Sequence, residues 1–174
     1  MKTHTKITLV LTIIIIVITS CLKPQSFPLE PQIEFISFNT KGDSGIFTIS
    51  FTDGDGDIGL NQEQLEPPFD TGSYYYYNLY MLYYEMMNGS WIRGTSDPLG
   101  NNFPTADSIT FALRIENITP VGQNKALKGE IEIVLEPSYF NSISNHNDSL
   151  IYKIILIDRS LNSSNIIETP LILR

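Results

Sequence analysis

The residues with the clearest chemical potential are three aspartates in the segment FTDGDGDIGL, residues 51–60. Asp53, Asp55 and Asp57 alternate with glycines, which let the backbone curl until the three carboxylates converge. Calcium takes six to eight oxygen ligands at about 2.3–2.6 Å, and a D-x-D-x-D spacing supplies the first three of them. The segment therefore predicts a site for Ca²⁺.

This segment departs from the best-known calcium loop. The EF-hand needs a glycine at its sixth position and a glutamate at its twelfth, where this chain has Ile58 and Gln64. An ordinary acidic β-turn is the alternative, because glycine supplies positive φ angles and aspartate bonds to its own backbone. Against that alternative, three carboxylates this close repel one another unless a cation or hydrogen bonds compensate.

The segments that must position these aspartates alternate apolar and polar residues with period two, which is typical of half-buried antiparallel strands. The pair Asn88-Gly89 between two apolar runs predicts a hairpin, because both central residues of a type I′ turn need positive φ. The expected strands are residues 33–38, 45–51, 80–87, 90–92, 110–116, 130–136, 151–157 and 166–173. Strands of this length and number favour an all-β fold, an immunoglobulin/fibronectin-like two-sheet antiparallel sandwich.

The same alternation predicts which side chains fill the space between the sheets. The expected inward residues are Phe47, Ile49, Phe51, Phe111, Leu113, Ile115, Ile131, Ile133 and Leu135. Pro170 in the last run suggests an edge position, since proline cannot donate to a sheet ladder.

A second polar segment, residues 158–165, lies between the last two expected strands. In a sandwich of this type, the loop after the second strand and the loop between the last two strands lie at the same pole. Asp158 or Asn162 then extends the oxygen cage begun by the three aspartates. The alternative is that Asp158 pairs with Arg159 or caps its own turn.

The amino terminus predicts a cellular address. Residues 1–21 read MKTHTKITLVLTIIIIVITSC, with two early lysines and an apolar run that is too short to span a bilayer. Its end, Ile18-Thr19-Ser20-Cys21, resembles the bacterial lipobox, and this resemblance implies cleavage before Cys21 and acylation of that residue. An ordinary secretory signal or a short membrane anchor is the alternative. Leu22 and Lys23 follow Cys21, where an aspartate would signal retention in the inner membrane. The outer membrane is therefore expected, and the sequence is compatible with either its periplasmic or its surface face.

These features divide the chain into three parts. Residues 1–20 are the expected lipoprotein signal peptide, and residues 21–31 are the lipidated cysteine with a proline-rich tether. Residues 32–174 are the expected β-sandwich domain.

Three motifs together carry a family resemblance. They are FTDGDGDIGL at residues 51–60, NITPVGQNKALKGEI at 117–131 and IDRSLNSSNIIETP at 157–170. With the lipobox, they resemble a family of Bacteroidota envelope lipoproteins, and the last motif resembles the closing hairpin of fibronectin-like domains. The resemblance implies a β-sandwich on the cell envelope and brings no catalytic residues with it.

Composition excludes several function classes. The chain has 19 acidic and 11 basic residues, a net charge of −8, which argues against non-specific nucleic-acid binding. One cysteine and two histidines exclude an internal disulfide framework, a cysteine-based zinc cluster and a histidine-rich metal centre.

The expected function is therefore a membrane-anchored, non-catalytic binding or structural sandwich, with calcium as its one expected cofactor and the bilayer, a glycan or an envelope protein as partner. His146, the only histidine after cleavage, lies in a polar segment without a nucleophile motif, so a hydrolase ranks last. A carbohydrate-binding accessory module of a glycan-uptake system is the alternative, with Tyr76 or Trp91 as contacts. It rests on the tyrosines at residues 74–77, 80, 83 and 84, one face of which otherwise packs in the core.

Overall fold

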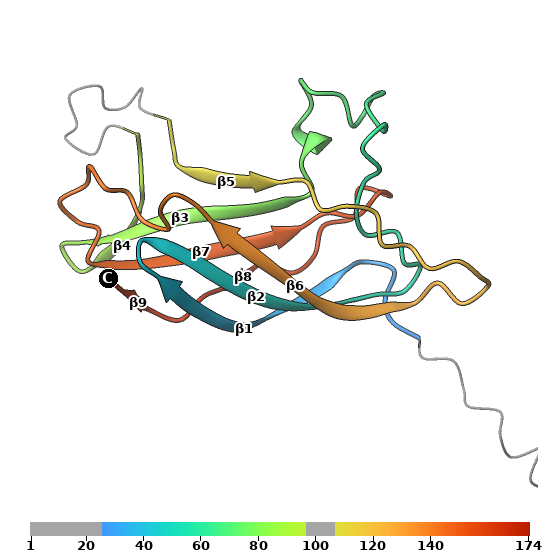
Figure 1. Ribbon diagram of the computed structural model, residues 1–174, viewed down its shortest axis with the longest axis horizontal. Coiled ribbons are helices and arrows are strands. Elements are labelled where there is room, and N and C mark those ends of the chain that lie inside the picture. The colour runs from blue at the N-terminus through green and yellow to red at the C-terminus, as the bar shows by residue number, and fades with distance from the viewer. Residues whose placement is uncertain (1–25, 97–106) are drawn as a thin grey trace, which may run out of the picture.

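The computed structural model describes residues 26–96 and 107–174, and Cys21 with its predicted lipidation lies outside them. Two antiparallel sheets pack against each other (Figure 1). One sheet has the order β1-β2-β6. Its strands are β1 (Gln32–Lys41), β2 (Ser44–Asp53) and β6 (Leu127–Leu135).

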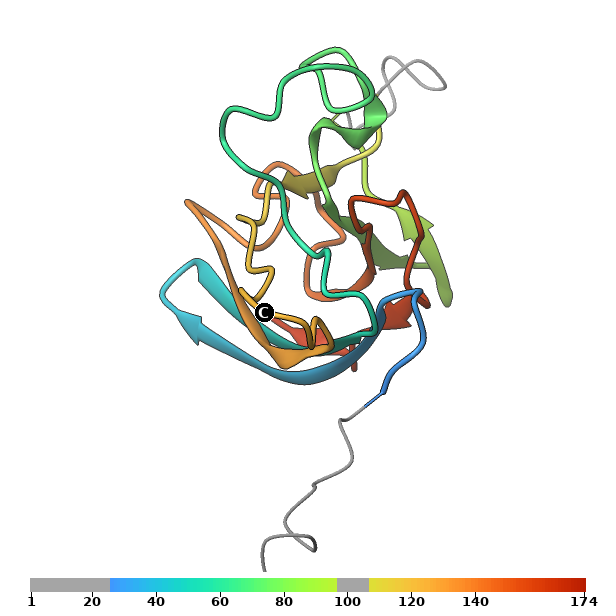
Figure 2. The same ribbon diagram turned by 90° about the vertical axis from the view of Figure 1, so that its right-hand side faces the viewer.

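The second sheet has the order β4-β3-β7-β8, with β5 also paired to β3 and β9 to β7. Its strands are β3 (Leu79–Met87), β4 (Ser90–Arg93), β5 (Thr110–Leu113), β7 (Ser149–Leu156), β8 (Ile167–Glu168) and β9 (Ile172–Leu173). Figure 2 looks along the strands and shows the sheet of β1, β2 and β6 curving beneath the other. The two strand orders are those of immunoglobulin-like sandwiches, and the predicted fold class is confirmed.

The core lies between the sheets and follows the predicted alternation. Phe47 and Ile49 on β2 are fully buried and lie opposite Ile133 and Ile131 on β6. β3 and β7 form the other wall, where Tyr83 and Tyr152 are fully buried and the Tyr152 ring contacts Phe47 edge-on. Burying apolar side chains from both walls supplies the main stabilisation of such a fold.

The predicted hairpin is also confirmed. β3 and β4 are joined by Asn88 and Gly89, whose φ angles are 50° and 80°. Two positive φ values match the right-handed twist of the paired strands.

Phe111, Leu113 and Ile115 pack against the core, so their predicted inward direction is confirmed. They are only partly buried, unlike the inward residues of β2 and β6. β5 pairs only with residues 79–82 of β3 and ends at Leu113, so it lies at an edge of its sheet. The β1-β2-β6 sheet covers this edge only in part. Alternation identified the inward face but not how far the opposite sheet extends.

Two further segments add detail to the predicted strands. Tyr74–Tyr76, in the tyrosine run before the strand expected at 80–87, form a 3-10 turn whose first N–H groups are capped by Ser73, because the Ser73 hydroxyl accepts a hydrogen bond from the Tyr75 N–H. The last expected strand is divided into β8 and β9 around Pro170. There the Thr169 hydroxyl accepts the hydrogen bond from the Tyr152 N–H instead of a strand carbonyl.

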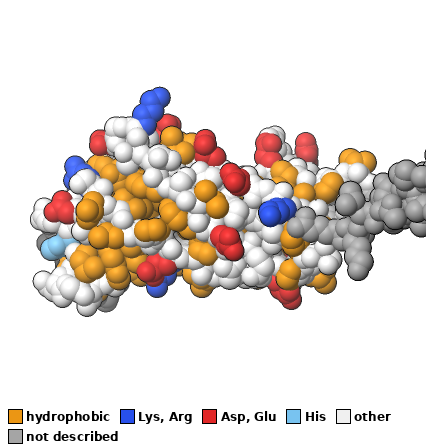
Figure 3. Space-filling model, turned by 90° about the horizontal axis from the view of Figure 1, so that it is seen from below, with side chains coloured by type: hydrophobic (Ala, Val, Ile, Leu, Met, Phe, Trp, Pro, Cys, Tyr) orange, Lys and Arg blue, Asp and Glu red, His pale blue; other side chains and the backbone are white. Residues whose placement is uncertain are grey.

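Figure 3, seen from below, shows acidic side chains spread over this face and hydrophobic ones gathered toward the end where the C-terminus lies. Among the described residues, helices of the length and hydropathy needed to span a membrane are absent.

Candidate metal centre

The predicted aspartates lie in a loop at one end of the sandwich, which we call the aspartate loop (residues 53–59). Asp53 ends β2, and the chain then turns away from the sheet. Gly56 permits this turn, with φ of 67°, and a Cβ there would lie 1.9 Å from the carbonyl oxygen of Lys125. Only glycine satisfies both conditions, so the local sequence dictates the shape of the loop.

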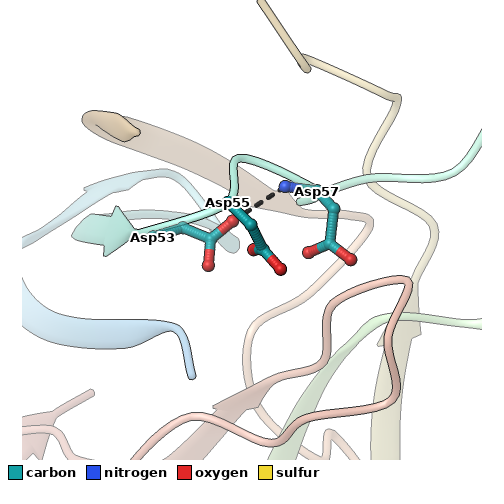
Figure 4. Close-up of side chains that lie close together, drawn as sticks. All are labelled: Asp53, Asp55 and Asp57. Carbon is teal, nitrogen blue, oxygen red and sulfur yellow. Dashed lines mark hydrogen bonds between the residues drawn. The ribbon is translucent and has the colours of Figure 1, made fainter. Parts of the chain in front are cut away.

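The three carboxylates converge as predicted. Asp53, Asp55 and Asp57 each offer an oxygen, and these oxygens all lie within 4.8 Å of one another. Figure 4 shows the three side chains on the same side of the loop. The Oδ1 atom of each is buried and has no hydrogen-bond partner, and Asp53 as a whole is 0% exposed. Buried carboxylate oxygens without partners are costly, so this cluster lacks a compensating group.

The other oxygens hold the loop in shape. Asp53 Oδ2 accepts a hydrogen bond of 2.9 Å from the Asp57 N–H. Asp57 Oδ2 accepts two, from the Ser160 N–H at 3.0 Å and the Ser160 hydroxyl at 2.7 Å. At Asp53 and Asp57, one oxygen is therefore used by the fold and the other is left free to bind a ligand.

The electrostatics of the cluster favour an added positive charge. The pKa of the Asp53 carboxyl is raised to about 6, mainly by burial; the hydrogen bond from the Asp57 N–H lowers it, and the charges of the neighbouring carboxylates add to the increase. Burial and the charge of Asp57 raise the pKa of Asp55, while Arg159 lowers it. A raised pKa means that the folded protein disfavours the charged carboxylate, a cost that a bound cation removes.

The second predicted loop reaches the same place. We call residues 158–165 the closing loop, and its Arg159 N–H donates to the Asp57 carbonyl at 3.2 Å. The Arg159 guanidinium also donates to the Gly59 carbonyl at 2.9 Å and to Asn117 Oδ1 at 2.6 Å. The closing loop is thus fastened across the aspartate loop and the segment before β6, and the predicted common pole is confirmed.

Asp158 and Asn162 lie in this loop with their own arrangement. Asp158 is 2% exposed and accepts from the Asn162 N–H at 2.8 Å and the Asn162 side-chain amide at 2.9 Å. The turn-capping alternative is therefore present. Burial raises the pKa of Asp158, and the hydrogen bonds from Asn162 lower it. The charges of Asp57 and Asp55 also raise it, so Asp158 interacts with the negative charge of the cluster. Its role as a cation ligand, and that of Asn162, stays a prediction.

Sequence reasoning missed Ser160, and it considered Arg159 only as a partner of Asp158 rather than of the aspartate loop. Both act through contacts with residues about one hundred positions earlier in the chain. Their types alone carry no signal for this, because the contacts depend on how far the closing loop extends over the aspartate loop.

The tyrosines gather at a separate feature. A pocket of about 490 Å³ lies on the outer face of the larger sheet, and Tyr74, Tyr77 and Tyr80 form part of its wall. The Tyr74 and Tyr80 rings are stacked in parallel with centroids 4.7 Å apart, and Tyr74 remains 59% exposed. The predicted contacts Tyr76 and Trp91 lie outside this lining.

Fold and site together define a class: an immunoglobulin-like sandwich with an acidic cluster on the loops of one pole. Comparisons with protein-family models, curated proteins and solved structures give no match to this chain. The resemblance to Bacteroidota envelope lipoproteins therefore stays a prediction from the sequence motifs.

Proposed function

We propose that this protein is a membrane-anchored envelope lipoprotein whose non-catalytic sandwich binds calcium at the aspartate loop and is stabilised by it. One observation carries the metal site: three converging aspartates each present a buried Oδ1 atom without a hydrogen-bond partner. Asp53 is completely buried, so water does not compensate its charge as it does at an exposed acidic turn.

Calcium fits this donor set better than other common metals. The donors are carboxylate oxygens at irregular positions along a loop, and calcium tolerates irregular oxygen geometry, whereas magnesium demands a near-ideal octahedron. Zinc and copper prefer nitrogen and sulfur donors, which the cluster does not offer. Asp158 supplies a fourth carboxylate from the closing loop, and a cation there joins the two loops.

The membrane anchor rests on the Ile18-Thr19-Ser20-Cys21 motif. We place the acylated Cys21 in the outer membrane, where several acyl chains hold a protein that a single chain would not. We propose a binding or structural role because the one histidine among the described residues lies away from the aspartate loop. The segment between β6 and β7 lies at the end of the sandwich opposite the aspartate loop (Figure 1), and His146 in this segment is exposed.

Thermal unfolding of the purified protein tests the metal site. With a dissociation constant of about 10⁻⁴–10⁻³ M, 10 mM calcium adds about 1.4–2.7 kcal/mol to the free energy of unfolding. That corresponds to a Tm increase of about 3–10 °C for a domain of this size. Asp55→Ala is expected to abolish the calcium-induced Tm increase. Asp43 is an exposed acid in the turn between β1 and β2, and Asp43→Ala is the control that retains the increase. Identical melting curves in calcium and EDTA would refute the site.

A carbohydrate-binding role is the second candidate, and the tyrosine-lined pocket favours it. Tyr74 is backed by Tyr80 and exposes its other side, which suits the apolar face of a sugar ring. A glycan array with the full chain tests this role. A reproducible glycan signal lost in Tyr74→Ala but kept in Trp91→Ala supports it, and signals unaffected by Tyr74→Ala contradict it.

A further inference from the structure

The chain that leads into the sandwich passes directly over the aspartate loop. Gly54 lies between Asp53 and Asp55, and a Cβ at this position would lie 2.4 Å from the Phe27 carbonyl oxygen and 2.6 Å from that of Pro28. Gly54 does not have a positive φ, so backbone conformation does not require glycine here. Close contact with the incoming chain is what requires it.

The strand register explains why the two segments meet. Gln32, the first residue of β1, lies opposite Thr52, the residue before Asp53. The residues before β1 therefore continue past the end of β2 and reach the loop. Pro31 is buried and Phe27 is partly buried, so this stretch is packed onto the domain rather than free.

The closing loop holds the same place from the other side. Asn165 accepts a hydrogen bond of 2.8 Å from the Ile33 N–H and donates one of 2.9 Å to the Ile33 carbonyl. The start of β1, the aspartate loop and the closing loop thus form one contact set. Whatever fixes the shape of the aspartate loop also fixes the surface on which residues 27 and 28 lie.

We propose that cation binding at the aspartates docks the amino-terminal segment, residues 26–31, onto Gly54, so that calcium controls how far the domain extends from its membrane anchor. This inference rests on the proposed calcium site. Without a cation, repulsion among the carboxylates loosens the loop and the Gly54 contact is lost. With a cation, the loop keeps the shape in which the carbonyl oxygens of Phe27 and Pro28 fit against it.

Chain length gives the size of the effect. Docking at Phe27 leaves six residue steps from Cys21, which span at most about 20 Å when fully extended. Undocking to Gln32 gives eleven steps, or at most about 38 Å. Pro28 and Pro31 restrict the free segment, which lowers the entropy lost on docking.

Limited proteolysis of the full-length protein in detergent tests the proposal. Leu29 is 60% exposed and provides a chymotrypsin site whose cleavage requires the segment to leave the domain. Calcium is expected to slow cleavage after Leu29 at least about fivefold, the lower end of typical coupling between two sites. Mass spectrometry follows this cut separately from cuts in the sandwich.

Gly54→Ala separates docking from metal binding. Its added methyl collides with the carbonyl oxygens of Phe27 and Pro28, so cleavage after Leu29 is fast with or without calcium, while a calcium-induced Tm increase remains. Gly72→Ala is the matched control, because its methyl meets only Asp70 Oδ2 at 3.6 Å, and it behaves as wild type. If Gly54→Ala does not fold, Phe27→Ala replaces it as the test, because it removes a partly buried side chain of the docked segment and so weakens docking.

The outcomes are distinguishable. Calcium that raises the Tm without changing cleavage after Leu29 overturns the docking proposal and leaves the metal site intact. Calcium that changes neither overturns both. By linkage, the factor by which calcium favours docking must equal the factor by which Gly54→Ala weakens calcium affinity, and unequal factors also contradict the proposal.

Discussion

The turn between β3 and β4 and the loop after β2 lie at opposite ends of the sandwich (Figure 1). Glu85, near the end of β3, and Asp53, the last residue of β2, are both buried carboxylates, but their hydrogen bonds differ. Glu85 on β3 accepts a hydrogen bond of 2.8 Å from the Tyr83 hydroxyl at Oε1 and one of 2.6 Å from the Ser144 hydroxyl at Oε2. Asp53 has a partner for Oδ2 only, and the Oδ1 atoms of Asp55 and Asp57 beside it are unpaired as well.

This contrast shows what the aspartate loop lacks. At Glu85 the protein itself supplies the donors, so the carboxylate is a structural element that needs nothing from solution. At the aspartate loop the donors are missing in the place where three charges meet, which is the arrangement expected when a cation supplies the compensation. If the hydrogen bonds indicate this difference correctly, substitutions at the two ends change stability and the calcium response in different ways.

The largest effect is expected at the fully paired end. Glu85→Ala leaves the Tyr83 and Ser144 hydroxyls without their acceptor and opens a cavity, so the free energy of unfolding falls by about 2–4 kcal/mol. Because no cation is involved, the loss is the same in calcium and EDTA. Urea unfolding measures it, with the exposed Glu132→Ala as control, expected within about 0.5 kcal/mol of wild type. A calcium-dependent loss would remove the distinction between the two ends.

The aspartate loop is expected to respond with the opposite sign. At pH 7.5 in EDTA, Asp53→Asn removes a buried charge and is more stable than wild type by about 1–2 kcal/mol. The amide oxygen still accepts from the Asp57 N–H. The same variant loses the calcium response. Asp43→Asn, exposed at the far end, leaves both quantities unchanged. Destabilisation by Asp53→Asn in EDTA would mean that the charge has a partner in the folded protein.

The pH dependence sharpens this test. The folded pKa of Asp53 is raised to about 6, above the value of an unfolded aspartate. Between these two values the folded state binds more protons than the unfolded state, so this group makes metal-free stability fall as pH rises from about 4 to about 6. The advantage of Asp53→Asn therefore vanishes near pH 4. Below pH 6, proton competition weakens calcium affinity about tenfold per unit.

The sequence could predict the parts of this molecule that depend on local pattern. The alternation of β2 and β6 identified Phe47, Ile49, Ile131 and Ile133 as core, because side-chain direction along a strand has a fixed period. The common pole of the two loops followed from the order of strands. Convergence of Asp53, Asp55 and Asp57 followed from their spacing and the glycines between them.

What could not be predicted depends on contacts between distant segments. The partial exposure of Phe111 reflects where the opposite sheet ends, and no residue near position 111 records that limit. Gly54 reads as one more flexible turn residue until the incoming chain is seen against it. Glu85, by its type, would be expected at the surface, and only the positions of Tyr83 and Ser144 explain its burial.

The smallest effect separates the ligands of the cation from the residues that orient them. The Ser160 hydroxyl donates to Asp57 Oδ2, while the unpaired oxygen of Asp57 is Oδ1. Ser160→Ala therefore removes an orienting bond at an exposed position, and the Ser160 N–H keeps its own bond to the same oxygen. We expect a loss of about 0.5–1 kcal/mol in both calcium and EDTA, measured by urea unfolding. Calcium affinity changes by about threefold or less, and Ser163→Ala in the same loop gives no change. If Ser160→Ala abolished the calcium response as Asp55→Ala does, the hydroxyl would itself be a ligand, and the cation would lie nearer the closing loop than the unpaired Oδ1 atoms indicate.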